Sequence, residues 1–113
     1  MLIYKILLPR EWAEFDARGE FAGSAFDAES GFVHCSGREQ VAGVAGRLFG
    51  DEPALVVVAL DADGLGDRVR WEASPDGGVF PHVYAPLPKD AVVEVHHIAG
   101  AAGVGRAVGA AQT

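Results

Sequence analysis

The feature that most constrains the fold is a continuous apolar run of seven residues, ALVVVAL, from Ala54 to Leu60. A helix needs ~20 apolar residues to cross a bilayer, so this run is far too short to span a membrane. Its length is ordinary for a β-strand, and it has no polar position that would favour a water-facing side. The run therefore predicts a buried strand that the rest of the chain must cover.

The composition fits one compact domain in an aqueous compartment. The chain has 113 residues, of which 50% are hydrophobic, and this is enough to bury a core without disulfides. The formal charge of −7 and the absence of any run of Lys or Arg argue against bulk nucleic acid as a partner. Cys35 is the single cysteine, and the charges at Lys5 and Arg10 come too early for a signal peptide. We therefore expect a cytoplasmic protein with no membrane partner, and we leave its oligomeric state open.

Two segments carry the pattern of core-facing helices. Pro9–Arg18 begins with proline and places Trp12 and Phe15 three residues apart on one face. Gly37–Phe49 has apolar side chains at the spacing i, i+3, i+4 and i+7. These positions are Val41, Val44, Ala45 and Leu48. Between the two helices, Glu20–Gly31 has no period and predicts a loop or short turns.

Strand patterns fill most of the remaining chain. The predicted strands are Leu2–Leu8, Phe32–Cys35, Ala54–Leu60, Arg68–Ala73, Val79–Leu87 and Ala91–Ala99. This order predicts an α+β fold, in which residues 1–99 form a single compact domain. We expect a bent sheet of about five or six strands, with mixed or antiparallel pairing, packed against the two helices. Residues 100–113 are rich in Gly and Ala and predict a loose C-terminal tail.

His34 stands close to the predicted start of the second helix. Ser36 precedes Glu39 by three residues, which is the spacing of a capping box. A helix N-terminus attracts anionic or ribose-phosphate groups, and a neutral imidazole nearby can donate or accept a hydrogen bond. His34 is therefore a candidate ligand-binding residue. The alternative is a strand-end histidine that donates to a backbone carbonyl.

A second group of polar and aromatic side chains lies between residues 69 and 88. Strand alternation puts Phe80, His82 and Tyr84 on one face, and it puts Glu72 opposite Trp71. An ordinary half-exposed sheet edge would explain this pattern equally simply. We predict instead that one concave pocket unites both groups, with Trp71 and Phe80 lining or supporting it. The residues expected to converge there are His34, Ser36, Glu72, His82 and Tyr84.

Other chemistries have less support. Cys35 points to the opposite face of its strand from His34, which disfavours a Cys–His catalytic pair and indicates a small core residue. The histidines and carboxylates show none of the spacings typical of a metal site, so no metal is predicted. Ser36 as a nucleophile is poorly supported, because capping accounts for it. The sequence contains neither a Gly-x-Ser-x-Gly motif nor a phosphate loop.

Several blocks of the sequence resemble a family of small bacterial proteins of unknown function. These blocks are IYKI, GFVHCSGREQV, RWE and FPHVYAPLPKDAVVEV, and together they span Ile3 to Val95. Fold classification places that family near the ADP-ribosyltransferases, so the resemblance implies a fold of that type. Some members carry a glutathione-transferase label, but such an enzyme needs a thioredoxin-like domain and a helical domain, for which this chain is too short.

The resemblance also implies roles for individual residues. ADP-ribosyltransferase-like sites use a histidine to hold a ribose, an aromatic ring to stack on nicotinamide and a glutamate to stabilise the cationic sugar. By residue type these roles match His34, Tyr84 and Glu72, although Glu94 comes in the expected chain order after the aromatic residue. The leading hypothesis is an enzyme acting on a NAD-like or nucleotide-like ligand, with NAD as the possible cofactor. A non-catalytic module that binds a small metabolite in the same pocket is the alternative.

Overall fold

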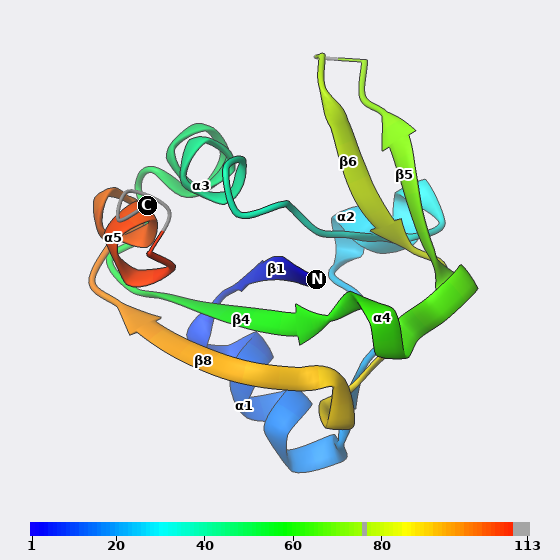
Figure 1. Ribbon diagram of the computed structural model, residues 1–113. Coiled ribbons are helices and arrows are strands. Elements are labelled where there is room, and N and C mark those ends of the chain that lie inside the picture. Colours follow the sequence, from blue (N-terminus) through cyan, green and yellow to red (C-terminus); the bar gives the residue numbers. More distant parts are fainter. Residues whose placement is uncertain (76, 110–113) are drawn as a thin grey trace.

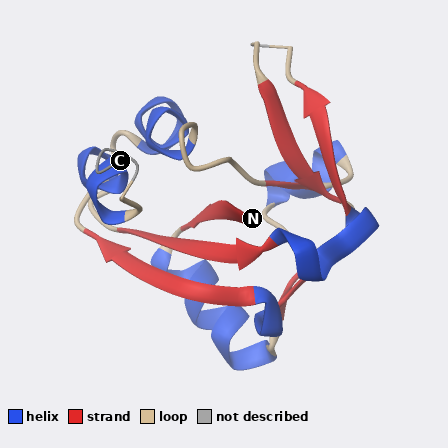
Figure 2. Cartoon of the chain, in the orientation of Figure 1, coloured by secondary structure: helices blue, strands red, loops and turns tan. Residues whose placement is uncertain are grey.

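The computed structural model describes residues 1–75 and 77–109 of the chain, and it combines helices with antiparallel strands in an α+β fold (Figures 1 and 2). The strands are β1 (Leu2–Leu7), β2 (Glu20–Phe21), β3 (Val33–His34), β4 (Leu55–Asp61), β5 (Val69–Ala73), β6 (Val79–Val83), β7 (Leu87–Pro88) and β8 (Val92–Ile98). The α-helices are α1 (Pro9–Arg18), α2 (Ala25–Ser30), α3 (Val41–Phe49), α4 (Ala62–Leu65) and α5 (Val104–Ala107). Short 3₁₀ turns cover Gly66–Arg68, Lys89–Ala91 and Ala101–Gly103.

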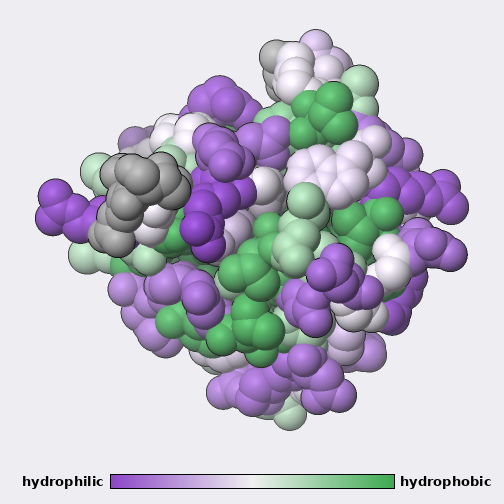
Figure 3. Space-filling model, in the orientation of Figure 1, coloured by the Kyte–Doolittle hydropathy of each residue, from purple (hydrophilic) through white to green (hydrophobic). Residues whose placement is uncertain are grey.

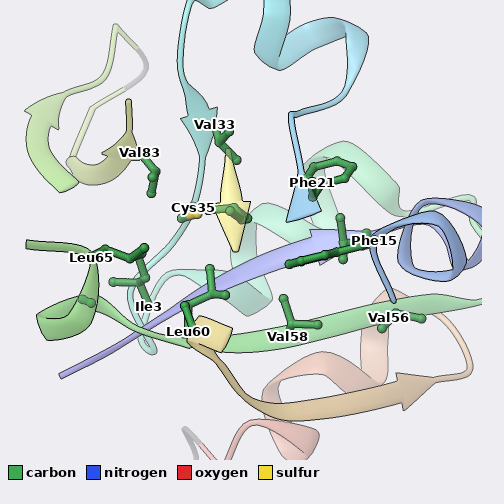
Figure 4. Packing of buried hydrophobic residues seen from close by; sticks show 14 residues of the cluster. Ile3, Phe15, Phe21, Val33, Cys35, Val56, Val58, Leu60, Leu65 and Val83 are labelled. Carbon is green, nitrogen blue, oxygen red and sulfur yellow. The ribbon is translucent and has the colours of Figure 1, made fainter. Parts of the chain in front are cut away.

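The predicted buried strand is the middle of the central sheet. This sheet has the order β1–β4–β8, with both pairs antiparallel. Val56, Val58 and Leu60 of β4 belong to one core cluster with Phe15 of α1, as the close-up of Figure 4 shows. Val57 faces the other way, into a second cluster that α3 and α5 complete. The sheet therefore separates two cores, and the prediction for the apolar run is confirmed.

The other strands form two smaller sheets rather than an extension of the central one. The first has the order β3–β6–β5, and the second pairs β2 with β7. Every pair is antiparallel within the described residues. A single isolated bridge, Tyr4 to Ser36, joins β1 to the chain after β3. The predicted single bent sheet is therefore wrong, because in the described residues β1 meets the chain after β3 only at this bridge and no continuous ladder joins the sheets.

The segment Glu20–Gly31 is not the loop or set of short turns that its lack of period predicted. It contains β2 and the six-residue helix α2. Ser24 and Asp27 form a reciprocal capping box at the start of α2, and Gly31 ends the helix with a φ of 85°. This geometry needs only a Ser-x-x-Asp pattern and a terminal glycine, so a helix too short to show a period still forms.

The predicted capping box before α3 is wrong. The helix begins at Val41 rather than Gly37. The backbone of Ser36 exchanges two hydrogen bonds of 2.8 Å with Tyr4, and this bridge keeps residue 36 extended. Gln40 replaces the predicted Glu39 as the side chain that reaches back, because its Oε1 accepts from the Gly37 amide at 2.8 Å.

The C-terminal segment packs against the central sheet instead of forming a loose tail. A 3₁₀ turn and α5 follow β8, and the Val104 and Val108 side chains, four residues apart, are buried in the second core. In Figure 1, α5 lies next to α3. The expectation is thus wrong up to residue 109, and residues 110–113 of the predicted tail lie outside the described part of the chain.

Hydrophilic side chains cover much of the surface seen in Figure 3, while hydrophobic side chains gather over the β4–β8 region. Val93 and Val95 of the edge strand β8 are 53% and 37% exposed. Within residues 1–75 and 77–109, no helix combines the length and the apolar character needed to cross a membrane.

Candidate functional site

A cleft of about 830 Å³ lies between α2 and α3, over β1 and beside β3 and β6. His34 of β3 and His82 of β6 both line it. The two residues are direct partners in the antiparallel register, and their ring centroids are 5.7 Å apart. Cross-strand partners point to the same face of a sheet, so the two imidazoles lie on the same side of β3 and β6.

His34 is fixed by a carboxylate that the sequence analysis did not identify. Oδ1 of Asp27 lies 2.7 Å from His34 Nδ1 and also accepts from the His34 amide at 3.0 Å. Lys5 donates to both oxygens of the same carboxylate, at 3.0 and 3.3 Å, and to the His34 carbonyl at 2.9 Å. Lys5 and Asp27 are both buried. A buried ion pair therefore holds the main chain and the ring of His34 together.

The charge of Asp27 fixes the tautomer of His34. Burial alone would raise the pKa of Asp27, but the Lys5 ammonium and hydrogen bonds from Ser24 and His34 lower it to about 2. An ionised carboxylate only accepts hydrogen bonds, so Nδ1 of His34 must carry the proton. A neutral imidazole with its proton on Nδ1 has Nε2 as its acceptor.

His82 has an equivalent arrangement with Glu72 of the neighbouring strand. Oε1 of Glu72 lies 2.7 Å from His82 Nδ1 and accepts from the Tyr84 hydroxyl, also at 2.7 Å. The hydrogen bonds from Tyr84 and then His82 lower the pKa of Glu72, and the bond to Glu72 raises the pKa of Tyr84. Glu72 is thus ionised, and by the same reasoning Nδ1 of His82 is the protonated nitrogen.

Aromatic side chains pack around both imidazoles. Phe26 of α2 stacks on His34 with the centroids 4.4 Å apart, and Phe32 stacks on His82 at 3.9 Å. Phe32 also contacts His34 at 4.6 Å and Tyr84 at 5.4 Å. One phenylalanine therefore lies among three polar rings and limits their orientations.

The structure brings together part of the predicted site. His34, Ser36, Phe80 and His82 line the cleft. Tyr84 lines a separate hollow of about 250 Å³ together with Phe32, and Glu72 lines neither. Glu72 is therefore connected to the cleft through its hydrogen bond to His82, and Tyr84 is connected through its hydrogen bond to Glu72.

Two further predicted residues, Trp71 and Glu94, also lie outside the cleft. Trp71 is 44% exposed and sits on the opposite strand face from Glu72, where its ring lies beside Gly37. Glu94 lies on β8 of the central sheet, where its Oε1 forms a hydrogen bond of 3.0 Å with His96 Nε2. Strand alternation could exclude Trp71 from the face of Glu72, but it carried no information about which sheet would hold Glu94.

The helix beside His34 is α2, not the predicted second helix. His34 was expected to benefit from the N-terminus of the second helix, but α3 begins seven residues after it in the chain. Its actual neighbour is α2, through Asp27. Asp27 was missed because it lay in the predicted loop, although the Ser24–Asp27 capping-box spacing was a readable signal.

The remaining polar candidates are accounted for by structure. Cys35 is a free thiol in the first core, and burial raises its pKa to about 12, so the prediction of a core cysteine is confirmed. Within residues 1–75 and 77–109, no group of three or more His, Cys, Asp or Glu side chains is placed to hold a metal ion.

Comparison with known proteins identifies a family. A family model described as "Protein of unknown function (DUF952)" matches residues 6–95. Protein CC0527 from Caulobacter crescentus is 42% identical in sequence to this chain. Its crystal structure matches with a TM-score of 0.81, and the match covers 86% of this chain and 85% of that one. The solution NMR structure of CC0527 is 43% identical, with a TM-score of 0.76 over 84% and 82%. No curated protein matches. The chain therefore belongs to the DUF952 family, a family of unknown function whose α+β fold it shares.

Proposed function

We propose that the cleft is an active site for a nucleotide-like small molecule, in which His34 and His82 transfer protons. The observation that carries this proposal is the pair of imidazoles 5.7 Å apart, each held through Nδ1 by an ionised carboxylate. A carboxylate behind an imidazole fixes its tautomer and orientation for acid–base work. In the described part of the chain, Nε2 of neither ring has a hydrogen-bond partner, so both nitrogens remain available to a ligand.

The size and lining of the cleft support a ligand of nucleotide dimensions. Its volume of about 830 Å³ lies in the range of small-molecule sites, which is roughly 300–1,000 Å³. The lining is mostly apolar with a few polar groups, as such sites require. Phe26 is 57% exposed at the cleft, next to His34, and it offers a flat surface on which a planar base can stack.

ADP-ribosyl transfer from a NAD-like ligand is the more specific form of this proposal. Here His34 holds the ribose and Glu72 stabilises the cationic sugar as the glycosidic bond breaks. Glu72 is ionised but does not line the cleft, so in this scheme its charge acts through the His82 ring, whose Nδ1 lies 2.7 Å from it. Tyr84 is a poor candidate for stacking on nicotinamide, because the Arg70 guanidinium already covers its ring at 4.7 Å. Glu94 has no role in this scheme, since it lies on β8 outside the cleft.

The test is a binding and turnover experiment with defined probes. NAD, ADP-ribose and glutathione are titrated into the wild-type protein by NMR and thermal shift, and bound probes are then followed for turnover by chromatography. We expect His34→Asn and His82→Asn to reduce turnover by about 10²-fold or more while affinity changes little. Glu72→Gln reports on the ADP-ribosyl form, and Glu94→Gln is the matched control outside the cleft.

The outcomes separate the alternatives. Binding without turnover supports a non-catalytic module that recognises a metabolite through the same residues. Turnover that survives in both histidine variants contradicts the proton-transfer role. NAD turnover that is unchanged in Glu72→Gln removes the ADP-ribosyl form and contradicts a need for the carboxylate behind His82, whereas the role of His34 is still tested by His34→Asn.

A further inference from the structure

Two arginines line the cleft at the end formed by the start of α1 and by α3. They are Arg10 and Arg47, and both are exposed. Leu8 beside the first arginine, and Val44 and Phe49 around the second, pack against the same core cluster. Arg10 lies in the first turn of α1, directly after β1, and Arg47 lies in the last turn of α3, which contacts β1. The imidazoles belong to β3 and β6, next to α2.

Neither arginine is used by the fold. Within residues 1–75 and 77–109, Arg10 and Arg47 have no hydrogen bond or ion pair to another side chain. Glu11 is the carboxylate nearest to Arg10 along the chain, but its Oε1 accepts from the Leu8 amide at 2.8 Å and caps α1.

The third cation of the cleft is already neutralised. Lys5 donates to both oxygens of Asp27 and is 7% exposed, so its charge is compensated inside the protein. The cleft thus has apolar side chains, two imidazoles, the two exposed guanidinium groups and the Glu11 carboxylate that caps α1. A planar guanidinium matches phosphate oxygens through paired donors, and both charge and shape favour phosphate over a neutral group.

We infer that Arg10 and Arg47 form a phosphate subsite, and that the ligand of the cleft is a nucleotide rather than a nucleoside. This inference rests on the proposed function, because it names the substrate class of the same site. The base lies against Phe26, the phosphate reaches the arginines, and the sugar lies near His34 and His82. Phosphate binding at the arginines also explains how a protein of net charge −7 attracts an anionic ligand to this face.

The experiment compares three probes by NMR titration: ADP, adenosine and inorganic phosphate. We expect ADP to bind at least tenfold more tightly than adenosine, and phosphate alone to bind far more weakly. Each of Arg10→Gln and Arg47→Gln should weaken ADP binding by about tenfold to 100-fold and leave adenosine binding unchanged. Arg18→Gln, in the last turn of α1 and outside the cleft, is the matched control.

Three results would overturn the inference: equal affinity for ADP and adenosine, ADP affinity that is unchanged in both arginine variants, or inorganic phosphate that binds as tightly as ADP. The failure of the proposed function has a different signature. In that case the histidine variants keep full turnover, or no turnover occurs, while the ADP preference and its dependence on the arginines remain.

Discussion

Asp27→Asn should be among the most destabilising conservative substitutions in this chain. The side chain is 1% exposed and is bonded to Lys5, to His34 and to the amide of Ser24. Asparagine keeps the shape and can still accept from the Ser24 amide, but it leaves the Lys5 ammonium buried without a counter-charge. Removal of one partner of a buried ion pair typically costs about 3–5 kcal/mol, a large share of the roughly 5–15 kcal/mol that stabilises an ordinary domain.

The pH dependence gives an independent estimate of the same effect. The pKa of Asp27 falls from 3.8 to about 2 on folding, which corresponds to roughly 2–3 kcal/mol of stabilisation by the ionised form. Because the pKa of the folded state is lowered, this contribution is complete above about pH 4. It is lost as the pH falls from about 4 through 2. The difference in stability between the wild type and Asp27→Asn should therefore shrink over that interval.

Urea denaturation between pH 7 and pH 2 measures both quantities. Asp63→Asn is the matched control, because Asp63 is 81% exposed in its pair with the N-terminus and such pairs contribute little. The reasoning is refuted if Asp27→Asn costs less than about 1 kcal/mol at pH 7. It is refuted equally if the difference from the wild type stays constant down to pH 2.

Three further predictions follow from the packing. Cys35 should not react with a thiol reagent at pH 8 in the native protein and should react at once in urea, because burial raises its pKa to about 12; rapid native labelling would contradict this. Val104→Ala should cost about 2 kcal/mol by chemical denaturation, since α5 completes the second core, whereas a loose tail would show no change. Phe32→Ala should broaden or shift the NMR signals of both His34 and His82, and Phe32→Leu should preserve them in part; unchanged imidazole signals in the alanine variant would rule out the packing role.

The sequence was most informative where a single local pattern determines the structure. The run around β4 and the proline-led helix α1 were both predictable, because neither depends on a distant partner. Strand alternation also placed Phe80, His82 and Tyr84 on one face of their strand, and it separated Cys35 from His34. Sequence alone could not show that β3 would pair with β6 so that His34 meets His82, since that register depends on tertiary contacts.

The errors have a common physical cause. Helices α2 and α5 are six and four residues long, too short for a hydrophobic period to develop. Each is defined instead by its caps or by one buried side chain such as Val104. The site residues Lys5 and Asp27 were missed for a related reason. Their charges stabilise the fold only as a buried ion pair, which no local sequence pattern shows. A reading that treats charged residues as solvent-facing cannot find such a pair.

The two histidines are held in ways that allow fold and chemistry to be tested separately. The carboxylate behind His34 is buried against Lys5 of the central sheet, so His34 cannot be released without a loss of stability. The carboxylate behind His82 is 37% exposed, and its partners are a hydroxyl and the imidazole itself, so Glu72 can be neutralised while the core remains intact. Substitution at Glu72 therefore isolates the orientation of one imidazole from the stability of the domain. Substitution at Asp27 perturbs both the orientation of His34 and the stability of the domain. The Glu72–His82 pair is therefore the place where a catalytic role can be measured.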